Sequence, residues 1–160
     1  ITLTFGGQSI SVTPSKRMRE GGIGMIGVLI TTHGNLGNEL ILAAEAIKGP
    51  LKNVLHVPVD QTKSVEQINK EMSSAIKKLD QGQGVLIMTD LFGGTPSNIS
   101  LSFLKEGKVE VVTGVNLPMM LKLSDMKEDM SLKECASFIS EYGKKNIYSA
   151  SEILSKKLSG

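Results

Sequence analysis

A histidine stands just beyond the first long apolar run of the chain, separated from it by one threonine, and it is the residue best suited to do chemistry. His33 comes after the run Ile26–Thr31 and is followed by Gly34. An imidazole has an ordinary pKa of about 6.5, so a neutral ring nitrogen is available near pH 7. Such a ring is a good nucleophile when a carboxylate holds one nitrogen and leaves the lone pair of the other exposed. The pattern indicates that His33 can accept a transferred group.

A second polar segment, Asp90–Asn98, contains a carboxylate and the hydrogen-bond donors that such a transfer needs. Asp90 also follows an apolar run, and we expect it to orient the imidazole of His33. Residues 25–160 contain no arginine, so phosphate recognition must rest on backbone dipoles, hydroxyls and lysine. Backbone N–H groups of a glycine-rich loop bind phosphoryl oxygens well. The expected donors are the amides of Gly93, Gly94 and Thr95.

Three further residues are expected to support this site. Thr32 and Gly34 flank His33, and Asn116 lies in a third polar segment, Gly114–Pro118. Each signal has an ordinary structural explanation when it is taken singly, because an aspartate can cap a turn and a glycine pair can serve a tight loop. The convergence of three segments favours function over structure.

The elements that position these residues alternate between short apolar runs and amphipathic stretches. Continuous apolar runs predict buried strands, and apolar residues three or four apart predict helices. The predicted strands are Ile26–Thr31, Val54–Val59, Val85–Thr89, Val109–Thr113 and a short final one, Asn146–Ala150. The predicted helices are Leu36–Ile47, Ser64–Leu79, Pro96–Leu104, Met119–Leu123 and Ser131–Tyr142.

Repeated strand–helix units predict a parallel sheet covered by helices on both faces. In open sheets of this kind, ligands bind beyond the carboxyl ends of the strands. Each of the three polar segments follows a predicted strand, so all three are expected at that edge. If the strand order is 2-1-3-4, the strand before Asp90 lies beside the strand before His33.

Composition predicts one main domain and a separate leader. Three of the 18 basic residues and one of the 16 acidic residues lie in 1–24, which leaves 15 of each in 25–160. A neutral domain argues against binding to nucleic acid. The boundary is marked by three glycines just before Met25. Residues 1–24 are either a small hairpin, with strands in Ile1–Phe5 and Ser9–Thr13, or an added segment.

The remaining composition predicts a cytoplasmic protein without cofactor or metal. No apolar run approaches the ~20 residues of a membrane-spanning helix, and the single Cys135 cannot form an internal disulfide. We interpret Cys135 and His56, which fall inside predicted elements, as structural. His33 and Asp90 alone are too few ligands for a metal. With 4% aromatic residues and no tryptophan, the chain offers little to stack on a base or flavin.

Three motifs resemble the IIA component of the mannose-family sugar phosphotransferase system. They are Ile26–Gly34 (IGVLITTHG), Asp90–Asn98 (DLFGGTPSN) and Gly114–Met119 (GVNLPM), in the family's order and approximate spacing. The resemblance covers residues 25–150, and together the motifs are specific. Phe92 stands where the family often has tryptophan, which is a conservative departure.

The resemblance implies a flavodoxin-like α/β domain, with an open parallel sheet of order 2-1-3-4, that is phosphorylated on His33. HPr, the phosphocarrier protein, would donate the phosphate, and a histidine of the IIB component would receive it. IIB would then phosphorylate sugar entering through the membrane components IIC and IID. The family also implies that Asp90 holds Nδ1, that Nε2 carries the phosphate, and that Thr95 and the adjoining glycine amides contact it.

The resemblance further implies a homodimer that exchanges its last strand, a part that Asn146–Ala150 would play. Since no IIB-like segment follows in the sequence, IIB is expected to be another chain. Two related functions remain open: a regulatory domain phosphorylated on the same histidine, and the phosphotransfer subunit of dihydroxyacetone kinase, which usually has a Gly-Ser-Ala-type loop at Gly93–Pro96. A nucleotide- or flavin-binding module is the alternative from another class.

Overall fold

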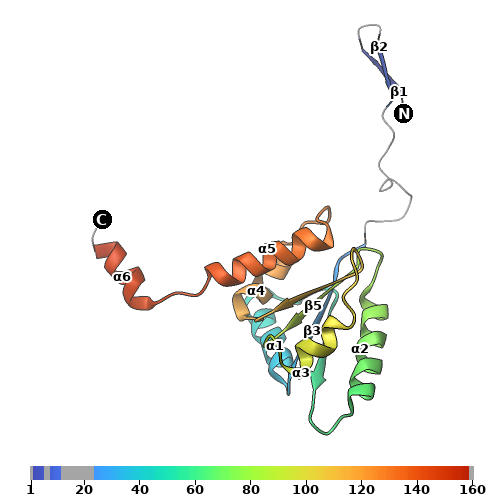
Figure 1. The fold of residues 1–160 in the computed structure, drawn as a ribbon. Helices are drawn as coiled ribbons and strands as arrows, with labels where there is room; N and C mark the ends of the chain where they lie inside the picture. The colour runs from blue at the N-terminus through green and yellow to red at the C-terminus, as the bar shows by residue number, and fades with distance from the viewer. Residues whose placement is uncertain (1, 6–7, 12–23, 159–160) are drawn as a thin grey trace.

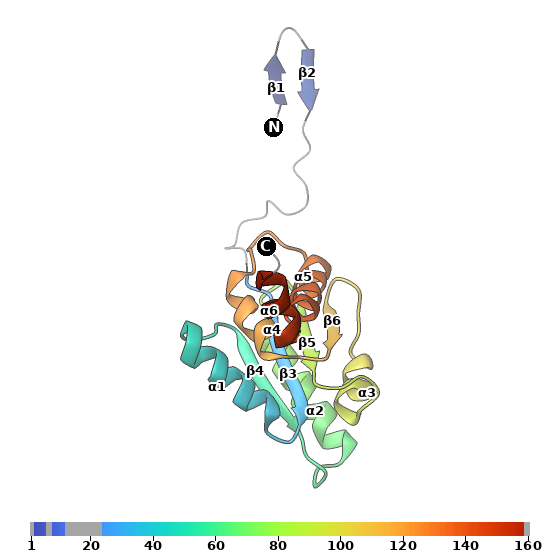
Figure 2. The same cartoon turned by 90° about the vertical axis from the view of Figure 1, so that its left-hand side faces the viewer.

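The structure, a computed structural model, describes residues 2–5, 8–11 and 24–158, and its centre is a four-stranded parallel sheet. The strands lie side by side in the order β4-β3-β5-β6 (Figure 2). They are β3 (Gly27–His33), β4 (Val54–Val59), β5 (Val85–Thr89) and β6 (Val109–Thr113). This is the predicted order 2-1-3-4, so the α/β open-sheet fold is confirmed.

Helices cover both faces of the sheet (Figure 1). Val28 and Ile30 of β3 pack in the cluster formed with the first set of helices, whereas Leu29 packs in the cluster on the other face. Successive side chains of a strand point to opposite faces, which explains this division. The first face carries α1 (Leu36–Lys48), α4 (Leu117–Lys122) and α5 (Leu132–Lys145), and the second carries α2 (Val65–Leu79) and α3 (Thr95–Leu101).

The helix ends follow from local sequence signals. The side chains of Ser64 and Ser131 each accept a hydrogen bond from the third amide of the helix that follows. The side chains of Gln67 and Glu134 accept one from the main-chain N–H of the cap, which completes a capping box. Helix α1 stops at Lys48, because Gly49 adopts a φ of +86°. The predicted helices that begin near Ser64 and Ser131 are therefore confirmed.

The parallel register brings the carboxyl ends of three strands to one edge. Thr31 of β3 pairs with Thr89 of β5, which pairs with Thr113 of β6. Beyond these pairs the chain leaves the sheet into the three polar segments. The amide of Val115 donates to the carbonyl of Thr89 at 2.9 Å and fixes the third segment against the second. The edge predicted for the site is thus the edge where the segments meet.

The prediction of a final strand over Asn146–Ala150 is wrong for the single chain. Helix α5 continues to Lys145, residues 147–149 are irregular, and the helix α6 (Ala150–Leu158) begins at Ala150. A strand needs a neighbouring backbone to satisfy its N–H and C=O groups. Ile147 and Tyr148 are instead 76% and 65% exposed, and Figure 1 shows α6 projecting away from the sheet. Strand exchange between two copies stays a prediction.

Two smaller differences concern α3 and the N-terminal segment. Helix α3 ends at Leu101 rather than Leu104, and the hydroxyl of Ser102 donates back to the carbonyl of Ile99 at 2.7 Å. Such side-chain bonds compete with helical hydrogen bonds.

Near the start of the chain, β1 (Thr2–Phe5) pairs antiparallel with β2 (Gln8–Ser11), as the predicted hairpin requires, while residues 12 and 13 lie outside the described part. Among the described helices, none is long and apolar enough to span a bilayer.

Candidate active site

His33 is the last residue of β3, and Asp90 is the first residue after β5, the neighbouring strand. Nδ1 of His33 lies 2.8 Å from Oδ2 of Asp90, and the main-chain N–H of His33 donates to the same oxygen at 3.1 Å. The other carboxylate oxygen accepts from the amide of Leu91 at 3.0 Å. Both oxygens of Asp90 are therefore engaged, which fixes the carboxylate against the imidazole ring.

The surroundings of Asp90 keep it ionised at neutral pH. Burial is the largest influence and raises the pKa of Asp90, since its side chain is only 13% exposed. The hydrogen bonds from the ring and main chain of His33 act in the opposite direction and together leave the pKa of Asp90 below its ordinary value. An ionised carboxylate only accepts hydrogen bonds, so Nδ1 of His33 donates to it, and in the neutral form of the ring the lone pair lies on Nε2.

The edge of the ring that carries Nε2 faces the glycine loop. A Cβ atom built on Gly94 would lie 2.8 Å from Cε1 and 3.4 Å from Nε2 of His33, so a side chain there would press on the ring. Gly93 has a φ of +81°, which favours glycine. The predicted loop therefore lies beside the nitrogen that Asp90 leaves available.

Helix α3 begins directly after this loop and directs its first amides towards the same edge of the sheet. Gly94 is its N-cap, and the first helical hydrogen bond runs from the amide of Asn98 to the carbonyl of Gly94 at 2.9 Å. The side chain of Asn98 donates to the carbonyl of Gly93 at 3.2 Å and fixes the loop on the helix. Amides in a first helical turn, here including that of Thr95, have no acceptor within the helix and can bind an anion's oxygens.

The three residues predicted to support the site have other contacts. Gly34, with a φ of +53°, turns the chain out of β3. The buried hydroxyl of Thr32 accepts from the amide of Gly37 at 2.8 Å, on the face of the sheet that carries α1. Asn116 caps α4 by accepting from Met119, 3.0 Å away, and its amide lies 3.5 Å from the carbonyl of Gly143 in α5. The hydrogen bonds of Asn116 go to helices, and those of Thr32 go to α1 and to His56 of β4, so neither side chain bonds to the ring of His33.

Two exposed apolar residues stand in the loop directly after Asp90, and the sequence patterns assigned them no role. Leu91 and Phe92 follow Asp90 and are 61% and 73% exposed. The signal was present, since two large apolar residues stand in an otherwise polar loop. Exposed aromatic and aliphatic side chains at a functional site are typical of protein-binding surfaces.

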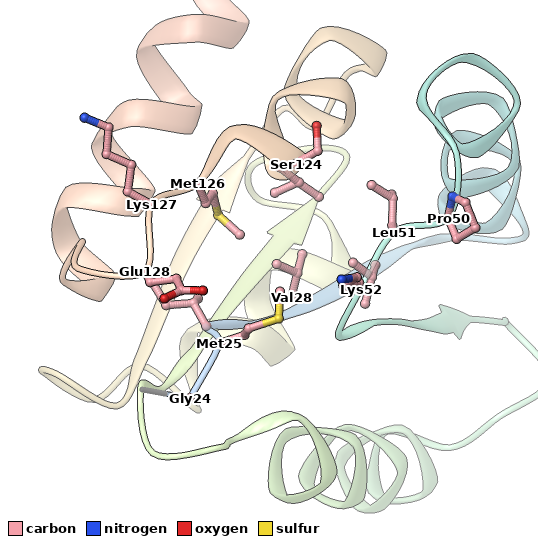
Figure 3. A pocket seen from close by; sticks show the side chains of 13 residues that line it. Gly24, Met25, Val28, Pro50, Leu51, Lys52, Ser124, Met126, Lys127 and Glu128 are labelled. Carbon is pink, nitrogen blue, oxygen red and sulfur yellow. The ribbon is translucent and has the colours of Figure 1, made fainter. Parts of the chain in front are cut away.

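A cavity of about 320 Å³ lies at the opposite edge of the sheet (Figure 3). Met25 and Val28 at the amino end of β3 line it, together with Leu51 before β4 and Met126 after α4. Strand β3 runs from this cavity to His33, so the cavity contains none of the predicted site residues. The side chain of His33 is 51% exposed, and the site is an open surface that another protein can reach.

Comparison with known proteins agrees with this geometry. A 29% identical relative, the PTS system fructose-specific EIIA component of Bacillus subtilis (strain 168), aligns over 133 residues, 82% of this chain and 91% of its own length. The PTS system mannose-specific EIIAB component of Escherichia coli (strain K12) is 29% identical over 124 residues, 76% of this chain, and the match spans only 38% of that longer protein.

Solved structures show the same fold. The PTS IIA protein associated with the fucose utilization operon from Streptococcus pneumoniae superposes with a TM-score of 0.72 at 26% identity, covering 82% of this chain and 97% of its own. The model of the EIIA-man family, described as PTS system fructose IIA component, matches residues 27–140. The chain therefore belongs to the EIIA-man family, the mannose-family IIA components of the sugar phosphotransferase system.

Proposed function

We propose that the chain accepts a phosphoryl group from phosphorylated HPr on Nε2 of His33 and passes it to a histidine of a IIB component. The observation that carries this proposal is the 2.8 Å contact between Nδ1 of His33 and Asp90, which leaves Nε2 facing the glycine loop. In the first step the lone pair of Nε2 attacks the phosphorus of the donor's phosphohistidine. The donor's N–P bond breaks, and its electron pair returns to the donor ring.

Asp90 would stabilise the charge that this step creates. The ring of His33 gains positive character as Nε2 bonds to phosphorus, and the carboxylate at 2.8 Å from Nδ1 offsets it. The carboxylate also fixes the tautomer, so that the same nitrogen attacks each time. In the second step the histidine of IIB attacks the phosphorus, and the N–P bond to His33 breaks in the same manner.

The glycine loop would hold the phosphoryl oxygens during both steps. The proposed donors are the amides of Gly93, Gly94 and Thr95 and the hydroxyl of Thr95, which is an exposed residue. The amide of Gly94 would exchange its 3.4 Å bond to the carbonyl of Leu91 for a phosphoryl oxygen. Fixed amide dipoles aimed at the transferring group lower the barrier without needing to reorganise. Residues 25–160 supply no arginine for this purpose, so these neutral groups carry the charge stabilisation.

The open surface around His33 suits two successive protein partners. Leu91 and Phe92 would contact HPr and then IIB, since both are exposed in the loop that directly follows Asp90. We further propose that residues 25–160 are the phosphotransfer domain, with 1–24 a separate leader, acting in the cytoplasm as a homodimer. The membrane components IIC and IID would be reached only through IIB.

The test is intact-mass spectrometry after incubation with phosphoenolpyruvate, enzyme I and HPr. The chain has two histidines, so His56→Gln is a matched control for His33→Gln. We expect a gain of about 80 Da, one phosphoryl group, in the wild type and in His56→Gln at completion, and none in His33→Gln. The gain should disappear in acid, because N–P bonds are acid-labile. A well-folded wild type without a mass gain contradicts the proposed function.

A further inference from the structure

The side chain of Thr32 lies one residue before His33 but on the opposite face of β3. Residues 28 and 30 of the strand pack towards α1, α4 and α5, whereas residue 29 packs towards α2 and α3. Thr32 continues the first set, and its fully buried hydroxyl accepts from the amide of Gly37 in α1 at 2.8 Å. His33 belongs to the other set, and its ring lies against Gly94. Thr32 therefore contacts α1 and not the glycine loop that is proposed to hold the phosphoryl group.

The hydroxyl of Thr32 accepts a hydrogen bond that an N-cap side chain usually accepts. Asn35 is the N-cap of α1, yet within the described chain its side chain makes no capping hydrogen bond. It donates instead to Glu39, at 2.8 Å. An amide in the first helical turn needs an acceptor from outside the helix, and Thr32 provides one for Gly37. Helix α1 is thus attached to β3 at the residue next to the nucleophile.

His56 of β4 also contacts the hydroxyl of Thr32. Its Nε2 lies 3.5 Å from the hydroxyl oxygen of Thr32, and a Cβ on Gly37 would lie 2.5 Å from its Cδ2. Burial lowers the pKa of His56, which favours the neutral ring. A neutral ring with its proton on Nδ1 can accept the hydroxyl proton of Thr32, so the oxygen stays directed at Gly37.

Three hydrogen bonds now hold the main chain around the nucleophile. The amide of His33 donates to Asp90 at 3.1 Å, and the amide of Gly34 donates to the carbonyl of Val59 at 3.2 Å. The bond from Gly37 to Thr32 closes the turn from the α1 side. Only this third bond depends on a side chain that neither contacts the ring of His33 nor faces the transferred group.

We propose that Thr32 is a positioning residue, whose hydroxyl holds the β3–α1 turn so that Nε2 of His33 points at the incoming phosphorus. Without the hydroxyl, the amide of Gly37 loses its buried acceptor and the turn shifts to find another. In-line phosphoryl transfer depends on the angle of approach, and a small displacement of a nucleophile lowers the rate strongly. The role rests on the proposed function of His33, because it concerns the same transfer.

Thr31 supplies a matched control. It is also fully buried and adjacent to Thr32, but its hydroxyl has no hydrogen-bond partner among the residues that the structure describes. Thr31→Val and Thr32→Val remove the same group at neighbouring positions of one strand. Thr32→Ser keeps the hydroxyl and removes only a methyl group.

The experiment compares the rate of phosphoryl transfer from HPr in the wild type, Thr32→Val, Thr32→Ser and Thr31→Val. We expect Thr32→Val to lower the rate at saturating HPr about tenfold with the KM for HPr unchanged, since it moves the nucleophile and not the docking surface. Thr32→Ser and Thr31→Val should transfer close to the wild-type rate. A wild-type rate for Thr32→Val, or an equally slow Thr32→Ser, overturns the proposal.

A second measurement needs no phosphoryl donor and separates the two proposals. In nitrogen-15 NMR of the unphosphorylated protein, we expect the ring resonances of His33 to shift in Thr32→Val and to stay in place in Thr31→Val. If the wild type accepts no phosphate, the proposed function fails while this ring signature still reports on Thr32. Unchanged His33 resonances in Thr32→Val contradict the positioning role whatever the wild type does.

Discussion

Oδ2 of Asp90 accepts two hydrogen bonds from the same residue, one from the main-chain N–H of His33 at 3.1 Å and one from its ring Nδ1 at 2.8 Å. The first fixes the end of β3 against the loop after β5, and the second fixes the rotation of the ring about that point. One carboxylate oxygen therefore determines both where the imidazole sits and which nitrogen it presents.

Asp90→Asn should slow phosphoryl transfer without preventing HPr from binding. The neutral amide keeps the shape of the side chain but offsets less of the positive charge that the ring gains. We expect the rate at saturating HPr to fall roughly 100-fold, with the KM for HPr close to the wild-type value. Rapid-quench measurement of transfer from labelled HPr gives both quantities. A wild-type rate in Asp90→Asn would remove Asp90 from the mechanism.

Acid should destabilise the wild type more than Asp90→Asn. The pKa of Asp90 lies below its ordinary value of 3.8 in the folded protein, so the carboxylate stabilises the fold above that pH. The loss of this contribution begins as the pH falls towards 3.8, and it is complete once the pH has fallen through the lower pKa of Asp90 in the folded state. Urea unfolding between neutral and acid pH should show a smaller decline in the free energy of unfolding for Asp90→Asn. Equal declines would mean that the contact with His33 does not favour the ionised carboxylate.

Gly94→Ala should impair transfer while leaving stability nearly unchanged. Its backbone is extended, with a φ of −75°, so alanine fits the conformation, but the new Cβ would lie 2.8 Å from Cε1 of His33. We expect the rate of transfer to fall at least tenfold, because the ring must rotate away from the loop.

Gly107→Ala is the matched control for Gly94→Ala. Gly107 has a φ of +68°, and a Cβ there would meet nothing within 4 Å. Alanine at such a φ costs about 1 kcal/mol of stability, and transfer should stay at the wild-type rate. Thermal unfolding should therefore show a loss of stability only in Gly107→Ala, and the transfer measurement should show a slower rate only in Gly94→Ala. A Gly94→Ala protein that transfers normally would show that the glycine loop does not face the reacting nitrogen.

Phe92→Ala should weaken the encounter with HPr and leave the chemical step intact. The ring is 73% exposed in the loop after Asp90, so its removal should destabilise the fold little, whereas a protein docking there would lose a contact. We expect the KM for HPr to rise about tenfold with the rate at saturation preserved. Ile47→Ala, at the far end of α1 and 63% exposed, is the matched control and should leave both quantities unchanged. Equal KM values for Phe92→Ala and the wild type would exclude the ring from the docking surface.

Much of the fold was predictable because the apolar runs are short and their ends are clearly marked. Continuous apolar runs indicated the strands before His33 and Asp90, and the structure shows both strands to be buried. Parallel strands bring their carboxyl ends to one edge of the sheet. The approach of these two residues follows from that rule. The contact between Gly94 and the ring does not, because it depends on how the loop folds back after Leu91.

The positions of Thr32 and Asn116 were harder to predict, although the signals existed. Alternation along β3 puts Thr32 on the face opposite His33, so its side chain cannot reach the same ligand. Asn116 precedes Leu117-Pro118, which is the pattern of an N-cap followed by a first-turn proline. Asn146–Ala150 has the composition of a strand but no neighbouring strand in the described chain, and strand propensity depends on such a neighbour.

The most direct test of the central claim is to locate the phosphoryl group on the ring of His33. The protein, labelled with nitrogen-15 in its histidines, is phosphorylated by phosphoenolpyruvate, enzyme I and HPr, and its phosphorus-31 and nitrogen-15 NMR spectra are recorded. We predict a single phosphoramidate whose phosphorus couples to Nε2 of His33, with Nδ1 still protonated and bonded to Asp90. Phosphate on Nδ1, phosphate on His56, or no phosphoramidate in the folded protein would contradict it.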